Sequence, residues 1–368
     1  RKEWLGKYER DRYLDTNTDK ITYTDFIDRE MIHFSKYDCD RSIPNMMDGL
    51  KISLRKILYS AFLKNLKDEI KVAQFSGYVS EKSGYHHGEA SLNQAIVGMA
   101  QNFVGSNNIN LFEPNGQFGT RILGGKDSAS ERYIFTKLNP ITRYIFPEID
   151  DKILQYLDDD GFPVEPIFYA PIIPMILVNG SKGIGTGFST DIMPYHPNDI
   201  IMYIKSKLQG KNTIDNFIPY YEGFRGTITR LDEHKFLIKG VYETVKADTI
   251  RVTELTVGVW TDDYKQFLEG LMDHGSGGGG DKPKRGAKKT VLVREYTDMS
   301  TDKTVDITIR LVRGKKDELE KQVTMKDEQE MYNGLEKALK LITTNTDTNM
   351  HMFDHEERCL LYTSDATD

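Results

Sequence analysis

The chain has 368 residues, of which 38% are hydrophobic and 29% charged, so its composition predicts a soluble globular protein of two or three domains. The longest apolar run, residues 167–178, is broken by Pro171 and Pro174, which excludes a membrane partner. Cys39 and Cys359 predict neither a disulfide framework nor a zinc site, and a reducing intracellular compartment is the simplest inference. The net charge of −7 argues mildly against DNA binding, although a local basic surface can override an average.

Residues 1–40 begin without a methionine, which indicates the interior of a longer protein. Asp38 and Asp40 are two residues apart, but without a third carboxylate a solvated pair is the better interpretation. We therefore predict no metal site in this chain.

Residues 41–56, RSIPNMMDGLKISLRK, are predicted to start the first helix. Its apolar positions follow the helical period, namely Leu50, Leu54, Ile57, Leu58 and Ala61. Lys51 and Arg55 lie one turn apart on another face, where they can meet one DNA backbone strand. An ordinary solvated helix face is the plainer alternative.

Residues 84–103 predict a turn followed by a second amphipathic helix. Two helices joined through a loop suit a helix-turn-helix, and the uncharged face of the second suits binding led by DNA shape. Tyr85, His86 and His87 precede this helix. No third ligand is near the histidine pair, so a zinc site is not expected.

Residues 115–136 form a glycine-rich segment, NGQFGTRILGGKDSASERYIFT, in which no regular helix or strand is expected. Arg121, Lys126 and Arg132 lie on it, and it ends on Tyr133. Pliant backbone, cations and a tyrosine hydroxyl suit a phosphodiester. Forming a phenolate at pH 7 costs about 4 kcal/mol, which the adjacent guanidinium of Arg132 can lower. The alternative is a structural loop with a core tyrosine.

The tetrapeptide RYIF recurs at residues 143–146. Tyr144 lacks the glycine-rich approach and lies between Pro140 and Pro147. We interpret Tyr144 as a core aromatic residue.

Residues 171–190 predict a β-hairpin with its turn at Asn179-Gly180. The GIGTG sequence at residues 183–187 is a weak match to a nucleotide-binding loop, because its later glycine spacing is wrong. Ile184 is of interest, since an aliphatic side chain held on glycines can wedge between base steps, although a core position is the ordinary alternative.

Beyond Pro197 the pattern changes to a helix at residues 199–208 and then to alternating segments typical of an antiparallel sheet. Residues 275–289 predict a flexible loop, and residues 318–342 are predicted to be rich in helix. The final residues, 356–368, show no packing pattern.

Several of these motifs resemble the DNA breakage–reunion core of eukaryotic-type type IIA DNA topoisomerases (topoisomerase II). The resemblance rests on RSIP…DGLK…RK, YHHGE, GQFGTR…GGKDSAS…RYIFT, GIGTG and ELTVGVWTDDYKQFLE, and it covers residues 1 to about 355. The sequence departs from the family pattern at residues 52–54, and at Thr256 and Gly258 beside Trp260.

The resemblance implies that Tyr133 attacks DNA to form a 5′-phosphotyrosyl link. Arg132 would support the transition state, and His87 would reach the scissile phosphate. It further implies DNA contacts by Arg41, Lys51, Arg55, Lys56, Tyr85, Arg121, Lys126, the wedge Ile184 and, less securely, Trp260.

The implied fold is α+β, with a winged-helix (helix-turn-helix) DNA-cleavage domain at residues 41–195 and a mixed α/β tower domain at 196–355. Residues 1–40 would link it to an absent Toprim domain, and 356–368 form an unassigned tail. The implied enzyme is a nuclear homodimer that acts on double-stranded DNA by ATP-driven strand passage. Its Mg²⁺ and ATP would be bound outside this chain. The alternatives are a catalytically silent DNA-binding fragment and, least favoured, a nucleotide-binding enzyme built on GIGTG.

Overall fold

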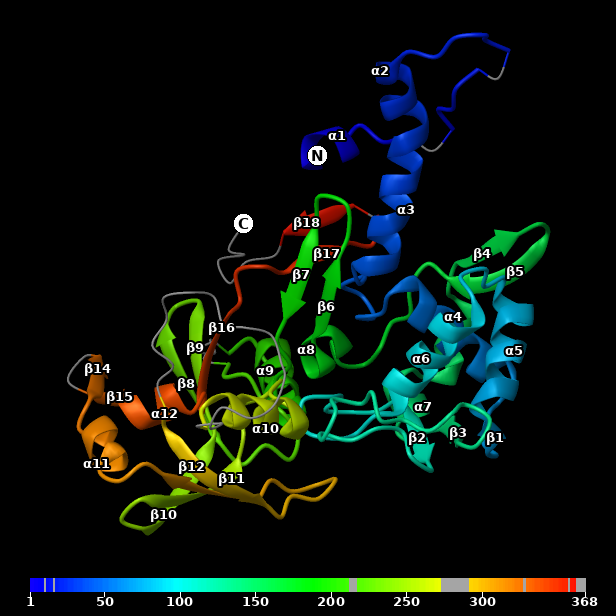
Figure 1. Cartoon of the computed structure of the whole chain (residues 1–368). Coiled ribbons are helices and arrows are strands. Elements are labelled where there is room, and N and C mark those ends of the chain that lie inside the picture. Colours follow the sequence, from blue (N-terminus) through cyan, green and yellow to red (C-terminus); the bar gives the residue numbers. More distant parts are fainter. Residues whose placement is uncertain are drawn as a thin grey trace.

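A computed structural model describes residues 1–9, 11–15, 17–211, 217–272, 291–326, 329–356 and 358–361. Figure 1 shows three parts: a helical projection from the N-terminal segment, a helical unit that continues from it, and a strand-rich unit formed by the second half of the chain. Within the described ranges no helix is both long and apolar enough to cross a membrane.

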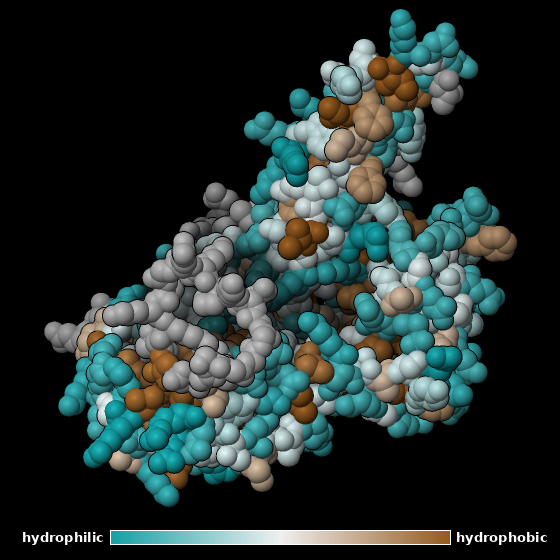
Figure 2. All heavy atoms as spheres, viewed as in Figure 1, coloured by the Kyte–Doolittle hydropathy of each residue, from teal (hydrophilic) through white to brown (hydrophobic). Residues whose placement is uncertain are grey.

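The projection follows the short helix α1 (Lys2–Leu5) and consists of α2 (Tyr23–Phe26), a π-helical segment (Ile27–Met31) and α3 (Ile32–Ser42). Thr22 caps its start, because the Thr22 hydroxyl oxygen accepts a hydrogen bond from the backbone N–H of Asp25. Apolar side chains stay exposed along it, as the brown and tan spheres of Figure 2 show, and these include Tyr23, Phe26, Ile27, Met31 and Phe34.

The helical unit packs three helices with a small antiparallel sheet. The helices are α4 (Ile52–Leu63), α5 (Val72–Ser83) and α6 (Glu89–Ala100), and the strand order is β1 (Ile70–Lys71), β3 (Phe135–Leu138), β2 (Phe112–Asn115). Its core includes Ile57, Leu58, Phe75, Val79, Leu92, Ile96, Phe112 and Ile134. The prediction of two helices missed α5. The predicted helix start at residue 41 is also wrong, because α3 ends at Ser42 and the next helix begins at Ile52.

After the short helices α7 (Thr142–Ile145) and η2 (Glu148–Lys152), the chain forms two hairpins. They are β4 (Tyr156–Asp159) with β5 (Phe162–Pro166), and β6 (Ser181–Ile184) with β7 (Ser189–Ile192). The hairpin predicted at 171–190, with its turn at Asn179-Gly180, is wrong, because the observed hairpin pairs β6 with β7 and lies wholly after Gly180. The apolar residues before Gly180 form the short helix α8 (Met175–Asn179), and Gly180, at φ +67°, ends it.

The strand-rich unit begins with α9 (Pro197–Leu208), as predicted. Its larger sheet has the order β10 (Val241–Lys246), β11 (Thr249–Glu254), β13 (Ile307–Leu311), β12 (Val293–Asp298), and the smaller has β16 (Ile342–Thr346), β9 (Lys235–Lys239), β8 (Thr227–Asp232). All these pairs are antiparallel, which confirms the predicted sheet pattern. Helix α10 (Thr261–Gly270) buries Tyr264 and Leu268 in the same core as the larger sheet.

Residues 318–342 are not rich in helix. The short helices α11 (Lys315–Glu320) and α12 (Gly334–Ala338) flank a hairpin of β14 (Val323–Lys326) and β15 (Gln329–Asn333). The loop predicted at 275–289 lies outside the described residues. In the predicted tail, β18 (Cys359–Leu361) pairs with β17 (His351–Phe353).

Candidate functional site

The glycine-rich segment folds into a compact loop between β2 and β3. Gly119, at φ +97°, packs so closely on Gly125 that an added Cβ would lie 2.6 Å from the Gly125 Cα. The Asp127 carboxylate accepts hydrogen bonds from the backbone N–H of Thr120 at 2.9 Å and from its hydroxyl at 2.5 Å. Glycine is therefore required here by backbone contact, and the loop has a defined shape.

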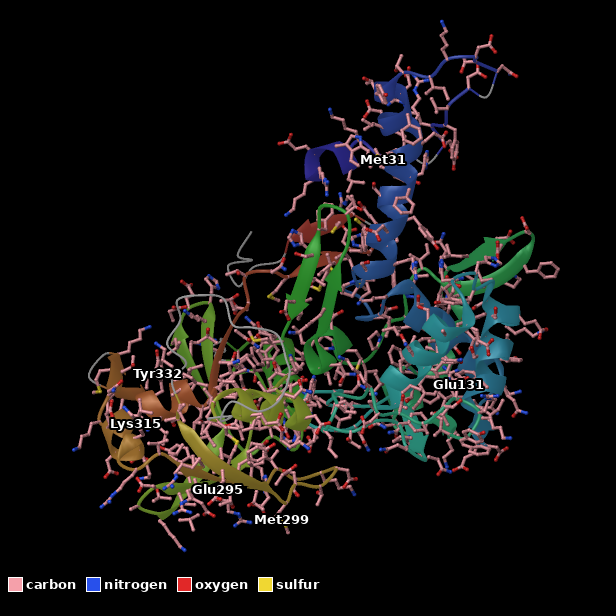
Figure 3. All side chains as sticks on the ribbon, viewed as in Figure 1. Met31, Glu131, Glu295, Met299, Lys315 and Tyr332 are labelled. Atoms are coloured by element: carbon pink, nitrogen blue, oxygen red, sulfur yellow. The ribbon has the colours of Figure 1, made fainter. Side chains whose placement is uncertain are left out.

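Tyr133 lies at the end of this loop, where the chain enters β3. The backbone N–H of Ala73 donates to the Glu131 carbonyl at 3.1 Å, and that of Val72 donates to the Ile134 carbonyl at 3.0 Å. Ile134 is buried in the core, so the preceding side chain points outward, and Tyr133 is 73% exposed. Glu131, two residues earlier, lies within the helical unit in Figure 3. The prediction that this tyrosine is available for chemistry agrees with its exposure.

Two cations accompany the tyrosine. Arg132 and Lys126 are exposed, and neither side chain forms a hydrogen bond or an ion pair with another described residue. A guanidinium without a protein partner keeps its donors for an anionic ligand. The loop thus presents a phenol and a guanidinium on neighbouring residues.

The second RYIF sequence differs in its arginine. Tyr144 is 76% exposed, so its interpretation as a core aromatic residue is wrong; the next two residues, Ile145 at the end of α7 and Phe146 after it, are buried in the core instead. The Arg143 guanidinium pairs with Asp151 at 2.9 Å and lies over the Phe62 ring, 3.4 Å from its centroid. This arginine is engaged within the fold, whereas Arg132 is not.

The turn between α5 and α6 presents His87 at a cleft. Gly84 and Gly88 bracket it with φ values of +59° and +87°. Tyr85 is buried, and its ring meets the His87 ring edge-on with centroids 5.3 Å apart. Direct DNA contact by Tyr85 is therefore not supported, and its observed role is to support the histidine ring. The Tyr37 phenol, from α3, contacts the imidazole as well.

Two of the basic residues predicted to contact DNA line the cleft beside His87. Arg41 and Lys56 line it together with Tyr37, His86 and His87. Lys56 also pairs with the buried Glu165 at 2.7 Å. The lining of the cleft is therefore only partly basic.

Lys51 lies at the start of α4 and donates a hydrogen bond to the Lys182 carbonyl oxygen of β6 at 2.5 Å. Burial lowers the pKa of the Lys51 ammonium, because desolvation disfavours its charged form. This lysine joins the helical unit to the base of the hairpin that carries Ile184.

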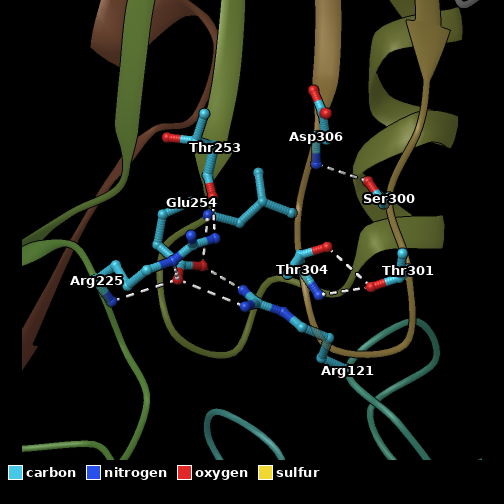
Figure 4. Close-up of polar contacts among 9 residues, drawn as sticks. Arg121, Arg225, Thr253, Glu254, Ser300, Thr301, Thr304 and Asp306 are labelled. Atoms are coloured by element: carbon cyan, nitrogen blue, oxygen red, sulfur yellow. Dashed lines mark hydrogen bonds and ion pairs between the residues drawn. The ribbon is translucent and has the colours of Figure 1, made fainter.

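Two residues predicted to contact DNA are buried and paired within the protein. The Arg55 guanidinium forms a buried ion pair with Asp48 at 2.7 Å, and the Arg121 guanidinium pairs with Glu254 of β11. Figure 4 shows Glu254 accepting from both Arg121 and Arg225. A carboxylate that is itself buried needs these donors, so Arg55 and Arg121 serve the fold. No local pattern signals the second pair, since Glu254 lies far from Arg121 along the chain.

Ile184 lies at the end of β6, next to the tip of its hairpin, and is 84% exposed. Thr186, in the tip, donates a hydrogen bond from its hydroxyl to Asp38 of α3 at 2.9 Å. The ordinary alternative of a core isoleucine is excluded by the exposure of Ile184. The GIGTG residues lie in this hairpin and are followed by β7 rather than by a helix, which does not suit a nucleotide-binding loop.

Trp260 is half-buried between the two units. Its ring meets Phe103 edge-on, and a Cβ added at Gly124 would lie 2.3 Å from its Cε2. The tryptophan therefore holds the strand-rich unit against the glycine-rich loop, and its DNA contact stays a prediction. Among the described residues, no three His, Cys, Asp or Glu side chains are placed to hold a metal ion.

The comparisons with known proteins agree with one another. The family model of DNA gyrase/topoisomerase IV matches residues 41–365, and the model of the C-terminal associated domain of TOPRIM matches residues 1–39. DNA topoisomerase 2 of Arabidopsis thaliana is 48% identical over 96% of this chain and 23% of its own length. DNA topoisomerase 2-beta of Gallus gallus is 42% identical over 96% of this chain and 21% of its own length.

Similar solved structures include the DNA-binding, cleavage and re-ligation domain of Plasmodium falciparum topoisomerase II. It has a TM-score of 0.87 and 43% identity, covering 99% of this chain and 46% of that one. The chain thus spans between a fifth and a quarter of the length of the two curated relatives.

Proposed function

Because this chain belongs to the DNA gyrase/topoisomerase IV family and is part of a type IIA cleavage and religation core, we propose that Tyr133 is the nucleophile that breaks and rejoins DNA. The observation that carries the proposal is an exposed Tyr133 beside an Arg132 whose side chain has no partner among the described residues, on a loop anchored to α5 by backbone hydrogen bonds of Val72 and Ala73. The duplicated motif lacks this arrangement, since Arg143 is paired with Asp151.

In the proposed reaction the Tyr133 oxygen attacks phosphorus as the phenol loses its proton. The bond from phosphorus to the 3′ oxygen of the preceding sugar breaks, that oxygen takes up a proton, and the 5′ phosphate stays on the tyrosine. One phosphodiester replaces another, so the reverse attack rejoins the strand. Arg132 stabilises charge that develops on the phosphoryl oxygens, and His87 donates a hydrogen bond to the same phosphate.

The proposed DNA surface runs over the helical unit, which we assign as the winged-helix domain. Arg41, Lys51, Lys56 and Lys126 contact backbone phosphates, and the exposed Ile184 inserts between base steps to bend the duplex. Arg55, Arg121 and Tyr85 are left out of this set because they are buried. We assign the strand-rich unit as the tower domain, which holds the cleavage loop through Trp260 and Glu254.

For the whole protein we propose ATP-driven strand passage by a nuclear homodimer, since two tyrosines are needed to cut two strands. One relative, from Dictyostelium discoideum, is named as a mitochondrial DNA topoisomerase 2. Among the residues that the structure describes, no group of three or more His, Cys, Asp or Glu side chains could hold a metal ion. We propose that the whole protein binds Mg²⁺ and ATP through residues outside this chain.

The proposal is tested by incubating the chain with nicked DNA, Mg²⁺ and a TOPRIM domain supplied in trans, then measuring protein–DNA adducts. Adducts are expected with the unchanged chain and with Tyr144→Phe, and none with Tyr133→Phe. Adducts that persist in Tyr133→Phe would overturn the assignment. DNA binding without any adduct would support the alternative of a silent DNA-binding module.

A further inference from the structure

Tyr37 is the one described side chain that forms a hydrogen bond with His87. Its phenolic oxygen contacts both ring nitrogens, lying closer to Nε2 and 3.0 Å from Nδ1. The two rings are tilted by 45°, with centroids 5.3 Å apart. Tyr37 comes from α3, fifty residues before the histidine, so the contact joins the helical projection to the α5–α6 turn.

The imidazole is held by two tyrosines. The buried Tyr85 ring packs edge-on against it from within its own turn, and the Ser80 hydroxyl donates to the Tyr85 carbonyl at 3.0 Å. A Cβ added at Gly84 would lie 2.2 Å from an Asp159 oxygen, so the start of the turn is fixed by contact as well. Of these neighbours, the Tyr37 hydroxyl is the group in hydrogen-bond contact with the ring nitrogens.

We propose that Tyr37 is a positioning residue for His87, which fixes the tautomer and direction of its ring; this inference rests on the function proposed for His87. The proton on one histidine nitrogen is set by the hydrogen bond that the other nitrogen makes. A Tyr37 O–H that donates to Nε2 leaves the proton on Nδ1. The Nδ1–H then serves as the donor to a phosphate oxygen of the bound DNA.

The tautomer of His87 can be measured directly. Replacing a tyrosine that only supports the fold would not change it. We expect ¹⁵N spectra of the chain to show the Nδ1–H form for the signal that His87→Ala removes. In Tyr37→Phe, which keeps the ring, that signal should shift towards the Nε2–H form without a change in melting temperature. Tyr13→Phe is a matched control, because Tyr13 stacks on His33, with centroids 4.3 Å apart, and does not contact His87.

A double-mutant cycle tests whether Tyr37 acts through the histidine. Loss of one hydrogen bond predicts a roughly fivefold slower rate of adduct formation in Tyr37→Phe. The same change in the His87→Ala background should slow it no further. An unshifted His87 signal, or an equal slowing in both backgrounds, would overturn the inference. The spectra need no cleavage activity, so failure of the proposed function is recognised separately, by the absence of adducts from the unchanged chain.

Discussion

The helical unit and the strand-rich unit differ in whether their key side chains are exposed or buried. In the helical unit, Tyr133 is exposed on its loop and His87 lies at a cleft; in the adjoining β6–β7 hairpin, Ile184 is exposed as well. In the strand-rich unit, the most buried charge, Glu254, is enclosed by two arginines. The side chains with proposed roles on DNA are therefore accessible on turns and loops, whereas buried ion pairs stabilise the structure beneath them.

The largest effect should come from breaking the buried pair. Glu254→Ala leaves the Arg121 guanidinium buried without its carboxylate, which predicts a loss of about 3–5 kcal/mol in the free energy of unfolding. Urea denaturation measures this. Glu295→Ala is the control, because its pair with Arg310 is exposed and should contribute about 1 kcal/mol or less. If both variants lost the same free energy of unfolding, the claim that the buried pair stabilises the fold more than the exposed pair would be refuted.

A second prediction compares the two RYIF arginines. Arg132→Ala should slow adduct formation by about a hundredfold, because one charged donor to the phosphoryl oxygens is lost, and should leave the melting temperature unchanged. Arg143→Ala should lower the melting temperature and leave the rate of adduct formation unchanged, since the Arg143 side chain pairs with Asp151 and stacks on Phe62 within the fold. Single-turnover rates and thermal melts on both variants measure the difference. Similar rates in the two would remove the special role of Arg132.

A third prediction sharpens the role of exposure. Ile184→Ala should weaken DNA binding about tenfold and reduce the bend angle measured by fluorescence transfer, since an inserted side chain stabilises the bent duplex. Ile153, 82% exposed, offers the matched control Ile153→Ala, which should change neither. An unchanged bend in Ile184→Ala would exclude the wedge.

The smallest effect concerns acid stability in the strand-rich unit. Hydrogen bonding from Arg251 lowers the pKa of the Asp306 carboxyl below its usual value. A carboxyl with a lowered folded pKa stabilises the protein above its unfolded pKa, and this contribution is lost as pH falls below about 4. Between pH 7 and pH 3 the free energy of unfolding should therefore fall less in Asp306→Asn than in the unchanged chain, and the two falls should differ by about 1 kcal/mol or less. Asp302→Asn, which removes no ion pair among the described residues, should match the unchanged chain.

Features that depend on local pattern were predictable from the sequence. The period of Leu92, Ile96 and Met99 located α6, and alternation located the strands of the antiparallel sheet. The hairpin turn was misplaced because Asn179-Gly180 has turn chemistry, yet here it ends a helix. Helix α5 was missed: no element was predicted between the first helix and the turn at residues 84–88.

The exposure of a candidate site residue agreed with the sequence prediction where one segment determines it, whereas contacts with distant partners were missed. Tyr133 and Arg132 are adjacent in sequence, so their proposed chemistry follows from the motif itself. The burial of Arg121 depends on Glu254, and the contact of His87 depends on Tyr37, fifty residues earlier. Neither pairing leaves a signal in a single sequence, because side-chain burial is decided by tertiary packing.

The most direct test of Tyr133 as the nucleophile is to map the adduct. After nuclease and protease digestion of DNA-linked protein, mass spectrometry should find a nucleotide joined through its 5′ phosphate to the peptide carrying Tyr133, and none on the peptide carrying Tyr144. A nucleotide on any other residue, or a 3′ linkage, would contradict the assignment of Tyr133.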